Sequence, residues 1–467
     1  MSEGRIWPLV FSFSWPALVS MTLNALYSVV DRVYIGQGCG GEAIAGLALT
    51  FPLLMFYAAF AILVGVGCST LLSIRLGEGD RESAERLLGQ CVLLKVVLGL
   101  TLPTAMWIFL DPLLRVTGGS QMTPAALAAA KEYLNIVLFA QLFAHLAFGF
   151  AASIRAEGAP KQSMHCMVAG FGLNFLLDPI LIFDRIPLGF GWSIPGLGWK
   201  IAGAAWATNI AMLFSCLWAL RFYWSGQSAV GLRLRHCLHF YPRLALRGLA
   251  VGTAPFLQHL ASTAIVFVLN LQFAKWALTP ENRTICIASF GIVQTVMLIA
   301  FMPILGLQQG LGPMLGFNWG ARNFGRVREI LWVGIKVTML ASVAAWALQV
   351  FGNHWLARCF VGASEERLLS TVTHDIRFAN CMVWLIGLNI LCTTFYQSIG
   401  RPKIAIFLSL LRQVVCLIPC AIVLPHFLEN HLMGVWASLP VSDTLCCLAS
   451  IPPALIIWKK LRLVSAR

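Results

Sequence analysis

The chain has 467 residues, of which 59% are apolar and only 11% are charged, and its mean hydropathy is +0.80. This composition excludes a water-soluble globular domain and indicates an integral membrane protein. The formal net charge of +14 does not indicate a nucleic-acid partner, because the basic residues are spread over the segments between apolar runs.

Apolar runs long enough to cross a bilayer recur along the whole chain, and each crossing needs about 20 residues. Turn signals such as Gly77-Glu78-Gly79-Asp80 separate them. We therefore predict an all-α fold with twelve transmembrane helices, at 6–36, 44–74, 87–110, 125–154, 162–183, 200–224, 244–276, 285–319, 329–352, 373–398, 403–425 and 432–458.

The basic residues are distributed unequally between the two sets of loops. If the N-terminus is cytoplasmic, twenty lie in cytoplasmic segments, seven in external segments and six within spans. The positive-inside rule then predicts a multi-pass protein with both termini in the cytoplasm. The first apolar run is too long for a signal-peptide core and lacks a small-residue cleavage motif, so we expect it to remain as the first span.

A polar stretch in the middle of the chain separates six predicted helices from six. We predict an N-terminal lobe at 1–224, a cytoplasmic linker at 225–243 and a C-terminal lobe at 244–467. The two lobes resemble each other in sequence, which predicts pseudo-symmetry.

Two nearly equal shifts carry this internal repeat. A shift of 243 positions superposes 44–88 on 287–331 without a gap. A shift of 242 aligns Gly158-Ala159-Pro160-Lys161 with Gly400-Arg401-Pro402-Lys403. Parallel six-helix repeats are a known transporter plan, with the substrate near the membrane midplane between the repeats.

An acidic residue lies inside the first predicted span. Asp31 follows Pro16 by fifteen residues, and the second half repeats this spacing with Pro255 and Asn270. An ionisable group at membrane depth is expensive and is a functional-site hypothesis by default. Because only the first half has the charge, we expect the coupling chemistry there.

Polar residues in two spans can meet this acid. Asn24, Tyr27 and Asp31 share one face of the first helix, and Asn174 and Asp178 are one turn apart in the fifth. Asp178 lies about 24 Å along its helix from the cytoplasmic end, at 1.5 Å per residue, which is similar to the depth of Asp31. We therefore expect the two carboxyl groups to lie close together.

Two such carboxylates cannot both be ionised cheaply in a low-dielectric site. The pair is expected to hold a proton near neutral pH, or Na⁺ with additional oxygens from Asn174 and from Thr208 in the sixth span. The alternatives are an ion pair of Asp31 with Arg32, water-exposed helix-end positions for either acid, and simple interhelical hydrogen bonding for Asn174 and Thr208.

Other polar residues within spans have less specific roles. The repeat places Cys416 and Cys420 opposite Asn174 and Asp178, so no acid is expected at these positions of the second half. For His145 a satisfied buried histidine is the expected role, and a proton relay is the alternative. Basic side chains within spans are expected to snorkel toward the membrane surface, namely Lys95, Lys336 and Arg412.

These motifs resemble the multidrug and toxic compound extrusion (MATE) family over nearly the whole chain. The matching segments are Pro16 with Val30-Asp31-Arg32-Val33-Tyr34-Ile35-Gly36, the 77–80 loop, Asn174-Phe175-Leu176-Leu177-Asp178-Pro179, and Ala207-Thr208 with Met212. The resemblance is to the bacterial multidrug efflux branch with the acids in the N-terminal lobe, and it implies the bacterial inner membrane.

The resemblance also implies roles for these residues. Asp31, Asp178, Asn174 and Thr208 would form the cation site, Asn24, Tyr27 and Met212 would line the N-lobe cavity, and Pro16 would be a bending element. The other family branch uses acids in the seventh and tenth helices. Here those spans are expected to offer Ser262, Asn270 and Asn389 instead, so no C-lobe cation site is expected.

The expected function is therefore an H⁺- or Na⁺-coupled antiporter that exports amphipathic, mostly cationic compounds as a monomer in the lipid bilayer. The alternative is a flippase for a lipid-linked saccharide, although such flippases tend to have extra helices and a basic cavity. No nucleophile, metal-ligand or cofactor constellation is visible, and the fourteen cysteines have no metal or redox spacing, so we expect neither an enzyme nor a bound cofactor.

Overall fold

The computed structural model describes residues 4–117, 122–189, 192–277, 279–361 and 366–464. Within these residues twelve helical segments are long and apolar enough to cross a membrane, which confirms the predicted all-α membrane fold. The segments of the first half are α1 (Ile6–Cys39), α2 (Gly41–Gly77), α3 (Arg81–Ile108), α5 (Pro124–Val137) continued by η2 (Leu138–Ala140) and α6 (Gln141–Ala156), α7 (Pro160–Ile182) and α8 (Lys200–Trp224).

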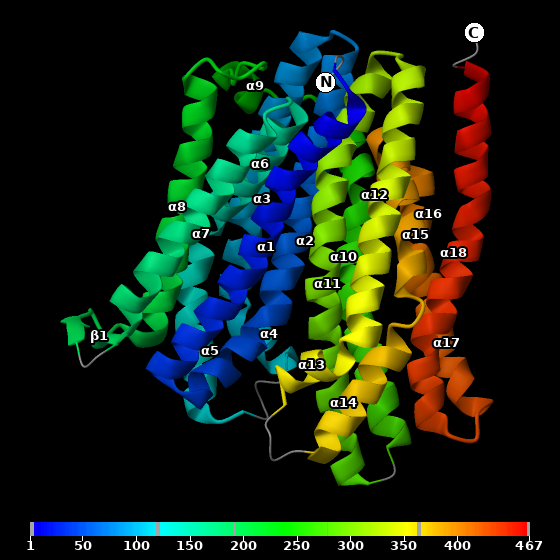
Figure 1. Ribbon diagram of the computed structural model, residues 1–467. Coiled ribbons are helices and arrows are strands. Elements are labelled where there is room, and N and C mark those ends of the chain that lie inside the picture. Colours follow the sequence, from blue (N-terminus) through cyan, green and yellow to red (C-terminus); the bar gives the residue numbers. More distant parts are fainter. Residues whose placement is uncertain (1–3, 118–121, 190–191, 278, 362–365, 465–467) are drawn as a thin grey trace. The chain divides into compact units, whose positions relative to one another are not determined.

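The second half has the same sequence of elements. Its segments are α10 (Pro242–Trp276), α11 (Pro280–Gly320), α12 (Phe324–Phe351), α14 (Glu366–Ala379) continued by η3 (Val383–Leu385) and α15 (Ile386–Ser398), α16 (Pro402–Leu410) continued by η4 (Leu411–Leu417), α17 (Ile418–Val423) and η5 (Leu424–His426), and α18 (His431–Val464). Short helices lie between spans at α4 (Leu110–Val116), α9 (Leu234–Leu238) and α13 (Asn353–Arg358). Figure 1 shows the helices in chain order.

A small antiparallel hairpin lies between α7 and α8, which the sequence did not predict. Strand β1 (Arg185–Gly189) pairs with β2 (Trp192–Pro195), with Arg185 opposite Pro195. The hairpin lies outside the spans, where backbone groups have access to water and no helix is required.

Two compact units are present. One consists of Met1–Leu18 and Thr253–Arg467, and the other of Val19–Gly252. We call them the 253–467 unit and the 19–252 unit. The start of α1 belongs to the former because Ile6, Val10 and Phe13 are buried in a core formed with α11, α12, α15 and α16. These compact units do not test the lobe boundaries predicted from the sequence, which stay a prediction.

Local geometry repeats between the halves at the ends of helices. Asp80 accepts a hydrogen bond from a backbone N–H in the first turn of α3, and Asn323 does the same for α12. The preceding residues Gly79 and Arg322 both adopt positive φ, at 77° and 56°. The two capping residues are 243 positions apart, and so are the two residues that precede them. The internal sequence repeat therefore corresponds to equivalent helix caps in the two halves.

The polar stretch 225–243 was predicted to be a linker, and within the 19–252 unit it packs closely on α3. It contains the short helix α9. The buried Gln90 amide of α3 donates to the carbonyls of His236 and His239, at 3.1 and 2.7 Å. The Glu85 carboxylate pairs with Arg233 Nε at 2.8 Å. The segment is therefore docked on this unit by specific contacts.

A second carboxyl group, Glu157, holds the start of this segment. Glu157 lies between α6 and α7, and the Ser228 hydroxyl donates to it. Burial raises the pKa of the Glu157 carboxyl to about 7 from its ordinary value of 4.5, which the hydrogen bond from Ser228 only partly opposes. The docked state therefore favours the protonated acid.

We expect docking of 228–230 to depend on pH. Because the docked state raises the pKa of this acid, docking is strongest below pH 4.5, where the carboxyl is protonated in both states. As pH rises the docking free energy falls, by up to about 3 kcal/mol above pH 7. Hydrogen exchange of the Ala229 and Val230 amides, corrected for intrinsic rates, measures this opening. Glu157→Gln keeps a hydrogen-bond acceptor but cannot ionise, so amide exchange in this variant should no longer depend on pH beyond the intrinsic rates. An equal pH dependence in wild type and variant would contradict the role of Glu157.

Candidate functional site

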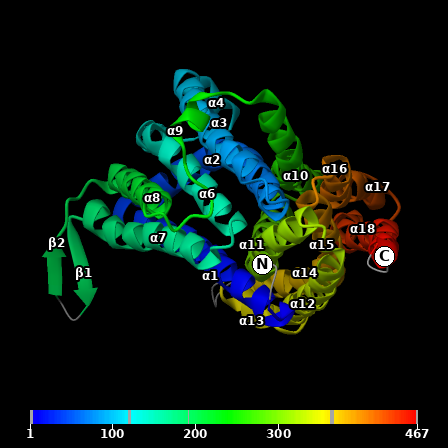
Figure 2. The same ribbon diagram turned by 90° about the horizontal axis from the view of Figure 1, so that it is seen from above.

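Five of the sequence-predicted residues come together in the 19–252 unit. Asp31 and Tyr27 are on α1, Asn174 and Asp178 on α7, and Thr208 on α8. Helix α7 packs along α8, and Figure 2 shows α6, α7 and α8 side by side from above. The one-turn spacing of Asn174 and Asp178 directs both side chains from α7 to the same side.

The acidic pair is buried and forms no ion pair with a basic side chain among the described residues. Asp31 is 8% exposed, Asp178 1% and Asn174 0%. Oδ1 of Asp31, both carboxyl oxygens of Asp178 and both polar atoms of the Asn174 amide have no conventional hydrogen-bond partner among the described residues. The two carboxyl groups are nevertheless close enough to interact directly. They can hydrogen-bond to each other only when one of them carries a proton.

The alternative role for Asp31, an ion pair with Arg32, is not formed. The Arg32 guanidinium lies 5.3 Å from the centre of the Phe51 ring in a cation–π contact. Neighbouring residues on a helix point to different faces, so Arg32 faces α2 while Asp31 faces the acid on α7.

Hydroxyl groups complete the polar cluster. Tyr27 Oη lies 3.5 Å from Thr208 Oγ1. Tyr133, on α5, meets the same Thr208 hydroxyl and is within electrostatic range of Asp31 and Asp178. Sequence reasoning missed Tyr133. The available signal was that it is the single tyrosine of its span.

A cavity of about 160 Å³ lies beside this cluster in the same unit. Asn24 and Met212, both predicted to line a cavity, are among its lining residues, together with Phe171. Tyr27, predicted with them, instead stacks its ring on Phe171 with the centroids 5.3 Å apart. It therefore supports the wall of the cavity and presents its hydroxyl to Thr208.

Pro16 lies within α1, in the part of that helix that belongs to the 253–467 unit. A proline inside a helix removes one backbone hydrogen bond and permits a bend. Two residues later, at Leu18, α1 leaves this unit. The bending role of Pro16 stays a prediction.

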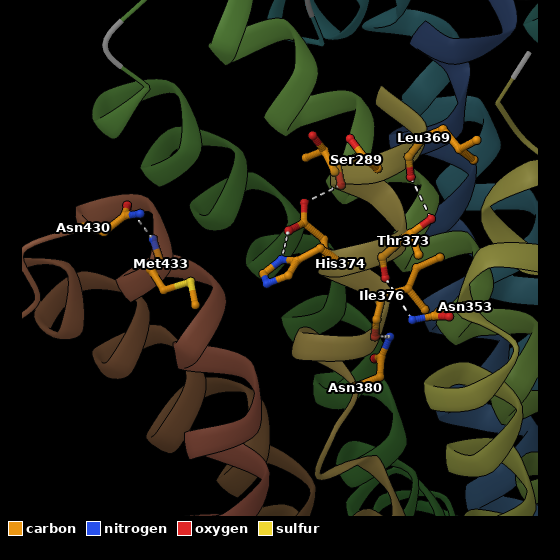
Figure 3. Close-up of polar contacts among 12 residues, drawn as sticks. Ser289, Asn353, Leu369, Thr373, His374, Ile376, Asn380, Asn430 and Met433 are labelled. Atoms are coloured by element: carbon orange, nitrogen blue, oxygen red, sulfur yellow. Dashed lines mark hydrogen bonds and ion pairs between the residues drawn. The ribbon is translucent and has the colours of Figure 1, made fainter. Parts of the chain in front are cut away.

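The expectation that the tenth span of the chain, which lies in the second half, offers no acid is wrong. Asp375 on α14 is 5% exposed. It accepts a hydrogen bond from the Ser289 hydroxyl at 2.6 Å and lies 3.3 Å from His374 Nδ1 (Figure 3). Under the shift of 242, Asp375 is equivalent to Tyr133 and to neither Asp31 nor Asp178.

Of the basic residues expected to snorkel, one is buried and another is partly buried in an ion pair. Lys95 is 1% exposed, donates to the Ala61 carbonyl at 3.0 Å and lies over the Phe148 ring. Arg412 pairs with the carboxylate of Asp443 at 2.7 Å. Snorkelling needs a path to the membrane surface, and the packing of neighbouring helices closes that path for both.

His145 is buried, as expected, but its hydrogen bonding is incomplete. Its Nε2 lies 3.4 Å from the Tyr57 carbonyl oxygen, and its Nδ1 has no partner among the described residues. The ring packs against Tyr57 with the centroids 4.0 Å apart. The choice between packing and proton relay for His145 stays open.

Comparisons with known proteins agree with this architecture. The MatE family model matches residues 16–180 and 283–423. The chain is 25% identical over 455 residues to the multidrug export protein MepA of Staphylococcus aureus (strain NCTC 8325 / PS 47), covering 96% of this chain and 93% of that one.

Solved structures show the same fold. A MATE transporter in complex with MaL6 has a TM-score of 0.86 at 24% identity, covering 99% of this chain and 98% of the other. A MOP superfamily transporter from Pyrococcus furiosus, described as having a binding pocket of reverse polarity, has the same TM-score and identity, covering 98% and 97%. With the family model matching well over half of its length, the chain belongs to the MatE family, the multidrug and toxic compound extrusion transporters that its motifs resemble.

Proposed function

We propose that this protein is a cation-coupled antiporter that exports amphipathic, mostly cationic organic compounds by alternating access. The observation that carries the proposal is the buried acidic pair Asp31–Asp178, which has no ion-pair partner among the described residues. A buried carboxylate without a counter-ion takes up a proton or a hard cation. The relative MepA, a multidrug export protein, supports export of drugs as the task.

The chemistry of the site fits either coupling ion. A proton would be shared between the carboxyl groups of Asp31 and Asp178. Na⁺ would be held by the same oxygens with the Asn174 carbonyl, which has no conventional hydrogen-bond partner among the described residues, and by the Thr208 hydroxyl. Both cations remove the repulsion between the carboxylates. A transported cation is cargo, so no resident cofactor is proposed.

The transport cycle follows from this change in charge. Cation uptake from the outside would remove one of the pair's two negative charges and the repulsion between them, allow α1 to repack near Pro16 and favour release of the substrate. Loss of the cation to the cytoplasm would reset the site. The ion drives the cycle only because it binds the two conformations unequally. The flippase alternative shares the fold, but the fold alone does not fix the substrate.

The cellular setting is part of the same proposal. The protein would be a monomer in the bacterial inner membrane, with both termini in the cytoplasm; the distribution of basic residues between the loops supports this orientation. The described start of α1 and the end of α18, both in the 253–467 unit, lie at the same end of that unit (Figure 1).

Separately imposed ion gradients test the proposal. In proteoliposomes we expect an opposing H⁺ or Na⁺ gradient to drive uphill movement of a fluorescent organic cation, with the other gradient inactive. Vesicles with the Asp31→Asn protein are the matched control. Movement that ignores both gradients, or that continues equally in the control, would contradict cation coupling.

A further inference from the structure

A buried ion pair joins the eleventh and twelfth spans, apart from the proposed coupling site. Arg412 Nε donates to Asp443 Oδ1 at 2.7 Å. The exposed fraction of the side chain is 15% for Arg412 and 1% for Asp443. Burying two charges costs several kcal/mol per ion before their attraction is counted, so a pair at this depth is a functional hypothesis.

The backbone around Arg412 is specialised. Arg412 lies in η4, a seven-residue π-helical segment between α16 and α17. Such segments are rare and often occur at functional sites, because the wider turn changes the direction of the side chains. The Asn389 amide on α15 donates to the Leu408 carbonyl, one turn before Arg412, and to the Ser450 hydroxyl on α18. These bonds hold the segment against α18, the helix that carries Asp443.

Few other ionisable groups face Asp443. They are thiols: Cys416 on η4, Cys381 just before η3, and Cys446 on α18 itself. The Arg412 guanidinium is the one ion-pair partner of Asp443 among the described residues, and Asp443 Oδ2 has no hydrogen-bond partner there. The pair therefore has zero net charge and contains one carboxylate.

We propose that Arg412 is a fixed counter-ion that neutralises Asp443 in place of a transported cation, and so keeps Asp443 out of ion coupling. The guanidinium does not lose its proton in proteins, so it cannot enter and leave as a coupling ion does. Without it, the buried carboxylate of Asp443 must itself take up a proton or a monovalent cation. Arg412 acts through Asp443 and not on the substrate. The effect of Arg412 on ion coupling rests on the proposed function.

Infrared spectroscopy of the purified full-length protein tests the charge state without transport. Arg412→Leu should gain the absorption of about one protonated carboxyl group per molecule at neutral pH. The gain should be absent in wild type, in Arg412→Lys and in Arg412→Leu/Asp443→Leu. An unchanged spectrum of Arg412→Leu in a buffer free of Na⁺ and K⁺ would overturn the proposal.

The wild-type protein keeps the proposal testable if Arg412→Leu fails to fold. Replacing both partners with apolar residues is often tolerated, because no charge is left unpaired. The difference between wild type and the double leucine variant should then show an ionised carboxylate. A protonated carboxyl signal in that difference would mean that Asp443 is neutral in wild type, and would overturn the counter-ion role.

Stoichiometry in proteoliposomes tests the consequence for coupling. Arg412→Leu should move one more cation per substrate than wild type, and Asp443→Leu in the same background should restore the wild-type ratio. An unchanged ratio together with a positive infrared result would overturn the coupling role. If wild type shows no ion-driven transport at all, the proposed function fails, while the infrared result still decides whether Arg412 neutralises Asp443.

Discussion

Replacing Asp31 by asparagine is expected to abolish gradient-driven export, whereas Asn270→Ala should leave it nearly intact. Both positions follow a proline by fifteen residues in their own half. Only Asp31 is titratable, and its partner Asp178 is buried with neither carboxyl oxygen conventionally hydrogen-bonded among the described residues. Initial rates of ion-driven efflux at matched expression measure the difference. Equal loss in both variants would show that the N-lobe is not the coupling lobe.

The same site predicts a separation of binding from transport. Asp178→Asn should still bind substrate, because the cavity lined by Asn24 and Met212 is unchanged, yet it should not export. A neutral amide cannot respond to the ion, so the ion no longer shifts the balance between conformations. Substrate affinity and efflux measured on one preparation test this, and wild-type efflux in Asp178→Asn would refute it.

The pH dependence of substrate binding identifies the groups that carry the proton. Two interacting carboxyl groups titrate as a pair, so wild-type affinity should change between about pH 5 and about pH 9. The Asp31→Asn/Asp178→Asn variant should show a flat profile. If it keeps the wild-type profile, the proton is carried elsewhere, and His145 is the next candidate because it is buried with a free Nδ1.

Gly252→Val is expected to prevent accumulation of folded protein. A Cβ atom at Gly252 would collide with the backbone carbonyl of Leu63 on α2. Gly67 on α2 has the reciprocal contact with the Gly248 carbonyl on α10. A backbone carbonyl at this distance cannot move aside as a side chain can. The loss of folding stability should therefore exceed the roughly 1–3 kcal/mol typical of overpacking.

Detergent-solubilised yield and melting temperature measure this effect. Gly291→Ala on α11 is the matched control, because a Cβ atom there meets nothing within 4 Å. Alanine in a helix interior should be neutral or stabilising by up to about 1 kcal/mol. A Gly252→Val protein that melts with wild type would show that α2 and α10 do not cross as closely as described.

Much of the fold could be predicted because membrane insertion depends on local composition. The twelve apolar runs correspond to twelve helical segments, because the polar groups of a backbone in lipid must hydrogen-bond within the segment. Helix ends were also local: the 77–80 turn places Asp80 as the cap of α3. The candidate site was accessible for the same reason, because a carboxylate such as Asp31 or Asp178 is conspicuous in an apolar run.

The sequence by itself therefore determined the number of spans, the turn at 77–80 and the acids of the N-terminal half. It did not determine which face of each helix is buried, because lipid and protein interior are both apolar. Phe139 is 79% exposed and Phe273 is 0% exposed, although both lie in apolar spans. Tertiary structure alone decided that Tyr133 joins the acidic pair and that Arg412 meets Asp443. Each of these contacts joins residues on different helical segments, and only packing brings those segments together.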